Sequence, residues 1–167
     1  ACMIGNNHHL DPIPGEDFQM FEQDLPGQNT SGLSFQTASS LPIESCITMN
    51  DAWGFKITDR NYKSYTNIIQ TLAGAAGRNS NLLLNVGPMA NGEMQVEFRD
   101  TLALVGKWVK KYGASIYGTR GGPLGPQTWG VTTQDSKHVY VHLMKQRSQS
   151  GLFIPGNFKV KKVGIMG

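Results

Sequence analysis

The sequence has few charged residues for its length. Asp, Glu, Lys and Arg make up 16% of the 167 residues, whereas ordinary soluble domains contain about 25%. The 15 Lys and Arg residues outnumber the 12 Asp and Glu residues by three, so the net charge is +3. Basic residues gather at positions 107–111 and 159–162, and short clusters of this kind are typical of a solvated surface. The charge pattern therefore does not indicate a nucleic-acid partner.

Other features are missing too, and each absence removes a class of protein. No apolar run approaches the ~20 residues of a membrane-spanning helix. The two cysteines, Cys2 and Cys46, are too few for a disulfide-rich scaffold, and both lie in apolar segments where we expect buried free thiols. The sequence contains no phosphate-binding glycine motif and no serine in a nucleophile elbow. It therefore does not indicate a membrane span, a nucleotide cofactor or a serine hydrolase.

Both ends of the sequence are apolar. Residues 1–5 run directly into a strand-like stretch, and residues 163–167 are still apolar at the last position. Native termini are usually polar and exposed. We therefore expect that the sequence is a piece of a longer protein, that it is not stable alone, and that the missing N-terminal part is its partner. Any targeting signal would then lie upstream.

The sequence does contain an alternation of strand-like and helical segments. The run at 82–86 is almost continuously apolar, as expected of a parallel strand buried on both faces. Residues 6–40 show no periodicity, and loops of such length are often functional. From the apolar spacing we predict strands at 2–5, 43–49 and 82–86 and helices at 65–77 and 96–112.

The spacing of the apolar residues changes after residue 118. Apolar residues alternate at 139–143, which predicts a strand, and residues 158–165 suggest at least one more. We therefore predict an α/β fold in which residues 1–118 form the C-terminal part of a (β/α)8-like TIM barrel. Residues 119–167 would begin an all-β domain. Barrel active sites lie in the loops at the carboxyl ends of the strands, so we expect functional side chains directly after each predicted strand.

Several side chains after the predicted strands carry chemistry. His8 and His9 with nearby carboxylates suggest a metal site, but adjacent residues of an extended chain point to opposite faces and rarely bind one ion. Glu22 is either a solvated loop carboxylate or a catalytic group. Trp53 is either a core residue or a platform for a sugar ring. The residue types alone leave these alternatives open.

Two further polar residues lie within the predicted strands. Glu44 needs a hydrogen-bond partner there, because a buried carboxylate without one is costly. Asn85 is expected to bind neighbouring backbone. We therefore assign both to structural or supporting roles.

Several separated motifs resemble those of a single enzyme family. In order and spacing they are similar to the α-L-fucosidases of glycoside hydrolase family 29, and the resemblance covers residues 1 to about 122. It implies a catalytic barrel followed by a C-terminal β-sandwich that begins in residues 119–167. The motifs are WGF at 53–55, NLLLNVGP at 81–88, NG at 91–92, VGKW at 105–108 and IYG at 116–118.

The resemblance implies a retaining exo-glycosidase, which uses two carboxyl groups about 5–5.5 Å apart and needs no metal or cofactor. The family's nucleophile is an Asp on an upstream strand, so by motif order it should precede Ala1. The general acid/base position matches Glu22, in the segment DFQMFE. Glu16, Asp17 and Asp24 lie on the same loop and are the alternatives for the proton donor.

The resemblance also implies sugar contacts. Trp53 matches an aromatic position that lines the fucose pocket, where the methyl group of the 6-deoxy sugar offers an apolar patch. His8 falls where many relatives carry an Arg that contacts the sugar, and a neutral His is not a fixed cation. A shift of one residue would place Asn7 or His9 there instead. Glu44 matches a carboxylate that is common in the family.

The implied substrate is a fucosylated glycan. The loop at 15–27 resembles that of a bacterial branch that prefers branched α-1,3/1,4-fucosylated glycans, and such substrates imply a periplasmic or secreted enzyme. The alternative is a non-catalytic carbohydrate-binding or degenerate homologue, with Trp53 and Trp129 stacking on sugars. The strand–helix alternation between 65 and 112 disfavours a binding module, because such modules are mostly β.

Overall fold

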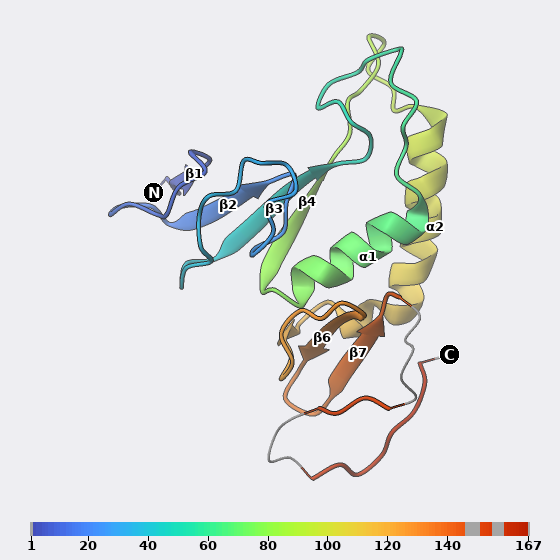
Figure 1. Ribbon diagram of the computed structural model, residues 1–167. Helices are drawn as coiled ribbons and strands as arrows, with labels where there is room; N and C mark the ends of the chain where they lie inside the picture. Colours follow the sequence, from blue (N-terminus) through green and yellow to red (C-terminus); the bar gives the residue numbers. More distant parts are fainter. Residues whose placement is uncertain (1, 146–150, 155–158, 167) are drawn as a thin grey trace.

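The computed structural model describes residues 2–145, 151–154 and 159–166 and contains two sheets (Figure 1). The first is parallel, with strand order β1-β2-β3-β4, and the second is antiparallel, with order β5-β6-β7. The α/β class predicted from the sequence is confirmed. The parallel strands are β1 (Gly5–Asn6), β2 (Phe18–Glu22), β3 (Ile43–Thr48) and β4 (Ser80–Asn85). The antiparallel strands are β5 (Arg120–Gly121), β6 (Gly130–Gln134) and β7 (Val139–Leu143).

Helix α1 (Tyr65–Ala76) connects β3 to β4. Parallel strands need such a crossover, because a tight turn cannot join them. The Ser64 side chain accepts a hydrogen bond from the Asn67 N–H and caps the first turn. The Gly77 N–H donates to the Ala73 carbonyl at 2.9 Å and closes the last turn. The helix predicted at 65–77 is therefore confirmed, with Gly77 at its end.

Helix α2 (Val96–Tyr112) has the bounds that the apolar spacing predicts. Phe98 and Val105 are its buried residues, and with Met49 and Ile68 they form the largest cluster between the helices and the sheet. The Phe98 ring meets the Tyr62 ring edge-on, with centroids 5.4 Å apart. A short 3-10 helix, η1 (Gly113–Ser115), follows. No helix in the described part of the chain combines the length and apolarity of a membrane span.

The two faces of the parallel sheet have different environments. Ile47 packs with Ala75 of α1 on one face. Side chains alternate along a strand, so Cys46 and its pairing partner Glu22 lie on the other face. Leu83 also lies on that face and is 41% exposed. In this chain β4 is therefore covered by helices on one face, and its other face, which carries Leu83, is open. Burial of β4 on both faces stays a prediction.

Strand β2 lies inside the segment that was predicted to be a loop. Its second residue, Gln19, is fully buried. The Gln19 amide donates to the Gln36 side chain and to the Thr37 carbonyl, both at 2.8 Å, and accepts from the Ser39 N–H at 2.9 Å. A buried polar residue that is fully hydrogen-bonded is stable but interrupts the apolar pattern. This is why the hydrophobic period did not reveal the strand.

The N-terminal strand is shorter and later than predicted. Residues 2–5 were expected to form it, but β1 contains only Gly5 and Asn6. Cys2 is exposed and Cys46 is half-buried, and both are free thiols. The prediction that both thiols are buried is therefore wrong for Cys2.

The antiparallel sheet packs against the ends of the two helices (Figure 1). Val131 of β6 contacts Ala73 of α1 and Ile116, which follows η1. A Cβ on Gly77 would lie 2.6 Å from the Val131 Cβ, so only glycine allows this approach. The strand at 139–143 is confirmed as β7. Phe158 lies outside the described residues, and residues 159–166 contain no strand. The domain division at residue 118 stays a prediction.

A half-buried histidine, His142, lies beside the hydrogen bond that joins the antiparallel sheet to η1. The Thr133 hydroxyl lies 2.6 Å from the Ser115 carbonyl and 2.9 Å from His142 Nε2. The single hydroxyl proton goes to the carbonyl, so the His142 Nε2–H must donate to Thr133. Burial lowers the pKa of His142, and this outweighs the raising effect of the Ser115 carbonyl.

The lowered pKa of His142 predicts a loss of stability in mild acid. The unfolded chain has an ordinary His pKa of about 6.5, above the folded value, so the unfolded state takes up protons first. The stability that neutral His142 contributes is fully present above the pKa of the unfolded chain. It is lost as the pH falls through the lower pKa that His142 has in the folded chain. We expect the free energy of unfolding, measured by urea denaturation of the protein that carries this chain, to decrease from about pH 7.5 to pH 5.5.

His142→Gln keeps a donor for Thr133 but cannot titrate, so it should flatten this pH dependence. His138→Gln, which changes an exposed histidine of the same sheet, is the control and should retain the wild-type slope. Equal slopes in the wild type and in His142→Gln would contradict the assignment.

Candidate active site

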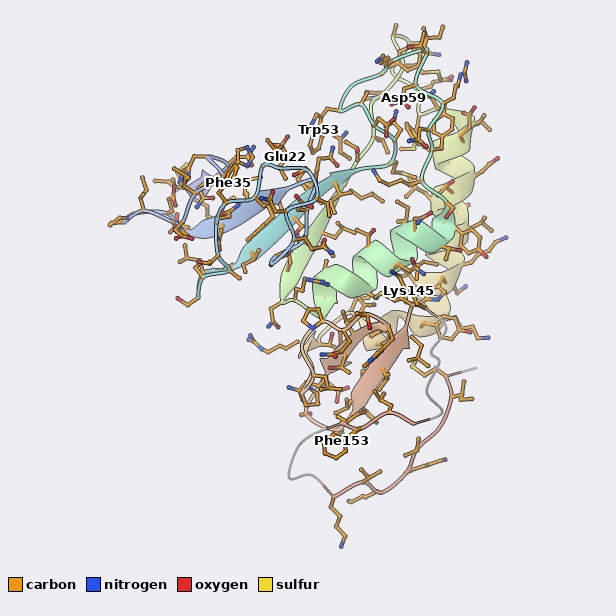
Figure 2. The ribbon with its side chains drawn as sticks, in the orientation of Figure 1. Glu22, Phe35, Trp53, Asp59, Lys145 and Phe153 are labelled. Carbon is orange, nitrogen blue, oxygen red and sulfur yellow. The ribbon has the colours of Figure 1, made fainter. Side chains whose placement is uncertain are left out.

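The functional side chains gather where the parallel strands end. Glu22 is the last residue of β2 and Asn85 is the last residue of β4, while Trp53 follows β3. Because the strands are parallel, their carboxyl ends meet at one edge of the sheet. Figure 2 shows Glu22 and Trp53 at this edge.

Glu22 is held on one of its two oxygens. Its Oε2 accepts a hydrogen bond from Asn7 Nδ2 at 2.9 Å and lies 3.7 Å from His9 Nε2. The side chain is 22% exposed. The position of Glu22 in a strand rather than in a loop corrects the sequence interpretation. The strand supplies a rigid backbone, so the carboxyl group has a defined direction.

The two adjacent histidines contact different carboxylates. His8 Nε2 lies 2.9 Å from Glu16 Oε1, whereas His9 lies beside Glu22. His9 has a left-handed backbone with φ of 62°, and its buried Nδ1 has no hydrogen-bond partner among the described residues. Within the described chain no three His, Cys, Asp or Glu side chains converge on a possible metal position. That His8 contacts the sugar stays a prediction, and Asn7 and His9 are the residues that the structure places beside Glu22.

Glu16, an alternative proton donor, holds the loop that precedes β2. Its side chain is 7% exposed. It accepts hydrogen bonds from Asn6 Nδ2 at 2.7 Å, from the Ile13 N–H at 2.9 Å and from His8. Burial raises the pKa of Glu16, but the three hydrogen bonds together outweigh it and the net pKa is lowered. A carboxyl group that stays ionised is a poor general acid.

Asp24 holds the loop that follows β2. It is buried, and it accepts the Thr30 and Ser31 N–H groups at 2.9 and 3.0 Å as well as both hydroxyls. Burial raises the pKa of Asp24, and these four hydrogen bonds lower it further than burial raises it. Asp17 is exposed and accepts the Ile4 N–H at 2.7 Å. All three alternatives to Glu22 therefore bind backbone N–H groups of the surrounding loops.

Trp53 is 38% exposed and is not part of the core of this chain. Its carbonyl accepts a hydrogen bond from Asn85 Nδ2 at 2.7 Å, which confirms that Asn85 binds backbone. Gly87 lies against the next peptide, where an added Cβ would be 2.3 Å from the Gly54 carbonyl carbon. The end of β4 therefore holds the backbone of Trp53 in place while the indole ring stays accessible.

Glu44 lies deeper on the same sheet face as Glu22. It has the partner that the sequence required, because Asn81 Nδ2 donates to its Oε2 at 2.8 Å. Cys46 follows on the same face. Burial raises the pKa of Cys46, and the charges of Glu44 and Glu22 raise it further. The face below the site therefore carries two carboxylates around a protonated thiol.

Sequence reasoning missed two residues that organise this edge, Asp59 and Lys63. Lys63 Nζ donates to the Thr48 carbonyl at 2.6 Å and to the Asn50 carbonyl at 3.2 Å, where β3 ends. Burial lowers the pKa of Lys63, against the raising effect of nearby carboxylates. Asp59 is 8% exposed. Both residues lie in a polar stretch without periodicity, so no local signal distinguished them from solvated loop charges.

Parallel strands that end in a half-exposed carboxylate and an exposed aromatic ring are an arrangement suited to binding and cleaving sugars. The class of protein that this fold defines is an α/β protein with a parallel sheet. Residues 1–114 match the family model described as Alpha-L-fucosidase. The chain belongs to this family.

Curated and solved relatives agree with the family assignment. The human plasma alpha-L-fucosidase is 28% identical over 121 residues, which cover 66% of this chain and 26% of the relative. The alpha-L-fucosidase isoenzyme 1 of Paenibacillus thiaminolyticus is 37% identical with a TM-score of 0.68, over 79% of this chain and 31% of that structure. A Bacteroides thetaiotaomicron family 29 enzyme, solved as a trapped covalent intermediate, shares the fold at 22% identity and a TM-score of 0.66, over 79% of this chain and 30% of its own. The chain thus spans about a quarter of the length of the curated relatives that it matches.

The close approach at Gly87 predicts a specific loss of stability. In Gly87→Ala the new methyl group would overlap the backbone of Gly54 and Phe55, and overpacking of this kind costs about 1–3 kcal/mol. Chemical unfolding of the protein that carries this chain measures the cost. Gly106→Ala is the control, because this helical glycine faces open space and alanine should stabilise it by about 1 kcal/mol. A Gly87→Ala protein as stable as the wild type would contradict the geometry.

Proposed function

We propose that this chain supplies the general acid/base of a retaining exo-α-L-fucosidase and that this residue is Glu22. The substrates are glycans with a terminal α-L-fucose, in particular α-1,3/1,4-branched ones. Family membership supports the reaction class, and the loop at 15–27 supports the linkage. The location of Glu22 at the carboxyl edge of the sheet supports the residue assignment.

The observation that carries the proposal is the difference between Glu22 and its neighbours. Glu16 and Asp24 have their oxygens occupied by loop donors and their pKa values lowered. Glu22 accepts one hydrogen bond, from Asn7 to Oε2, and no described residue bonds its Oε1. A general acid needs an accessible oxygen from which a proton can reach the substrate. Of these three carboxylates, Glu22 alone meets this requirement. Asp17 also has an oxygen without a described partner, but it directly precedes β2 and so lies at the amino end of that strand, away from the edge that carries Trp53.

The chemistry follows from the two states of one carboxyl group. Protonated Glu22 donates its proton to the glycosidic oxygen while the nucleophile, an Asp upstream of Ala1, bonds to the anomeric carbon of fucose; the glycosidic C–O bond breaks and the rest of the glycan leaves as an alcohol. Ionised Glu22 then takes a proton from water while the water oxygen bonds to the anomeric carbon, the bond from that carbon to the Asp breaks, and free fucose leaves. Asn7 keeps the carboxyl group oriented in both steps. The covalent intermediate trapped in the Bacteroides relative supports this two-step route.

Trp53 supplies the apolar part of the sugar site. Its ring is exposed at the edge that carries Glu22, and its backbone is held by Asn85. An aromatic face suits the methyl group and the apolar C–H bonds of fucose. Since fucosylated glycans occur outside the cytoplasm, the compartment we propose is the periplasm or the exterior. The upstream part of the same enzyme is the partner that completes the site.

Glu22→Gln tests the assignment. Without a proton donor, hydrolysis of an α-1,3/1,4-branched fucosyl glycan should fall by about 10²–10⁴-fold. An activated aryl fucoside, whose leaving group needs no proton, should lose much less in its first step. Azide, which needs no general base, should restore turnover of the aryl substrate. Steady-state kinetics on both substrates measure these effects.

Glu16→Gln is the matched control, because it should lower turnover of both substrates by the same factor through the loop that Glu16 holds. Unchanged glycan turnover in Glu22→Gln would contradict the assignment. A wild-type protein without fucosidase activity would favour the non-catalytic homologue instead.

Trp53→Ala tests the sugar platform. Loss of the aromatic face should raise the KM for the fucoside and lower kcat/KM by about tenfold, since a lost aromatic contact is worth about 1 kcal/mol or more. The free energy of unfolding should change little, because the ring is exposed. Wild-type kinetics in this variant would show that Trp53 does not contact the sugar.

A further inference from the structure

We propose that Asp59 is the positioning residue for Trp53, which it holds through the backbone of the loop that follows β3. The proposal rests on the proposed function, in which Trp53 contacts the sugar. Asp59 lies eleven residues after the end of β3 and six residues after Trp53, in the same loop. Figure 2 shows it beyond Trp53, toward the start of α2.

The Asp59 carboxylate accepts four hydrogen bonds. Its Oδ2 accepts from Asn50 Nδ2 at 2.8 Å, from the Ala52 N–H at 2.9 Å and from the Asp51 N–H at 3.1 Å. Its Oδ1 accepts from the Asn61 N–H at 3.1 Å. One buried carboxylate therefore gathers the three residues that directly precede Trp53 and ties them to the other side of the loop.

The charge on Asp59 is maintained by the same contacts. Burial raises the pKa of Asp59, but hydrogen bonds from the Ala52, Asn61 and Asp51 backbone and the nearby charge of Lys56 together lower it below its ordinary value. The group is therefore ionised at neutral pH and accepts at both oxygens. Asp51, the other carboxylate of the loop, is exposed and accepts only the Asn61 side chain.

The other restraints on Trp53 act on different atoms. Asn85 holds the Trp53 carbonyl, and Gly87 lies against the Gly54 peptide. Lys63 holds the Thr48 and Asn50 carbonyls at the strand end. The N–H groups of Asp51 and Ala52, just before Trp53, donate to Asp59 instead.

Backbone control matters here because the Trp53 ring is exposed. A side chain that is 38% exposed is only partly fixed by packing, so its direction depends on where the backbone leaves the loop. Removal of the Asp59 carboxylate would leave three N–H groups and one side-chain amide without their acceptor. The loop would then rearrange, and a ring displaced by about 1 Å no longer fits the sugar.

The test compares Asp59→Ala and Asp59→Asn in the protein that carries this chain. Asp59→Asn keeps one acceptor oxygen and should give the smaller effect. With 5-fluorotryptophan incorporated, ¹⁹F NMR reports the environment of each indole, and the Trp53 signal is the one that disappears in Trp53→Phe. We expect Asp59→Ala to shift or broaden the Trp53 signal and to leave those of Trp108 and Trp129 in place.

Asp135→Ala is the matched control. Asp135 is also a carboxylate that accepts backbone N–H groups, at 2.6 Å from Lys137 and 2.7 Å from His138, but it lies in the turn between β6 and β7. Its removal should leave the Trp53 signal unchanged. A Trp53 signal that is the same in Asp59→Ala as in the wild type would overturn the proposal.

Kinetics give the functional readout. We expect Asp59→Ala to raise KM and lower kcat/KM by up to about tenfold, the loss expected of Trp53→Ala. The loss should be smaller in Asp59→Asn, and Asp135→Ala should lose nothing beyond a common stability effect. If Trp53→Ala itself has wild-type kinetics, the sugar role of Trp53 fails, and the ¹⁹F spectra still decide whether Asp59 positions the ring. Equal losses in Asp59→Ala and Asp135→Ala would also overturn the proposal.

Discussion

The parallel pairing of β3 with β4 is the constraint on which the rest of the structure depends. Six residue pairs join the two strands, from Ile43 with Ser80 to Thr48 with Asn85. This pairing requires the crossover through α1, which covers one face of the sheet and leaves uncovered the face that carries Glu22, Glu44 and Leu83. It also brings the ends of both strands to one edge. The parallel pairing of β2 with β3, in which Glu22 lies opposite Cys46, brings Glu22 to the same edge as Trp53, although 31 positions separate them in sequence.

Buried carboxylates give shape to the loops at that edge. Glu16, Asp24 and Asp59 each accept several hydrogen bonds from loop backbone, and the pKa of each is lowered despite burial. Loops with few apolar residues cannot be held by packing, so charge-assisted hydrogen bonds take over this role. The result separates two functions that look alike in a sequence: carboxylates that hold loops, and Glu22, which keeps an accessible oxygen.

Sequence patterns predicted the parts of the fold in which burial follows a simple period. Both helices and the three strands β3, β4 and β7 were found in this way, because one covered face imposes regular apolar spacing. β2 was missed, since one of its two buried residues is the polar Gln19. The long-range motifs identified Trp53 and Asn85, whereas Asp59 carried no signal of its own. Its importance depends on which distant N–H groups the folded loop brings to it, and no local pattern records that.

The donors that converge on Asp59 have a consequence for how this family can diversify. Three of the four are backbone N–H groups, at positions 51, 52 and 61, and any residue except proline can supply such a group. The side chains at these positions are therefore free to drift without moving the aromatic ring. Substitutions of the side chains around the sugar site can therefore change which groups they recognise without changing the shape of the loop.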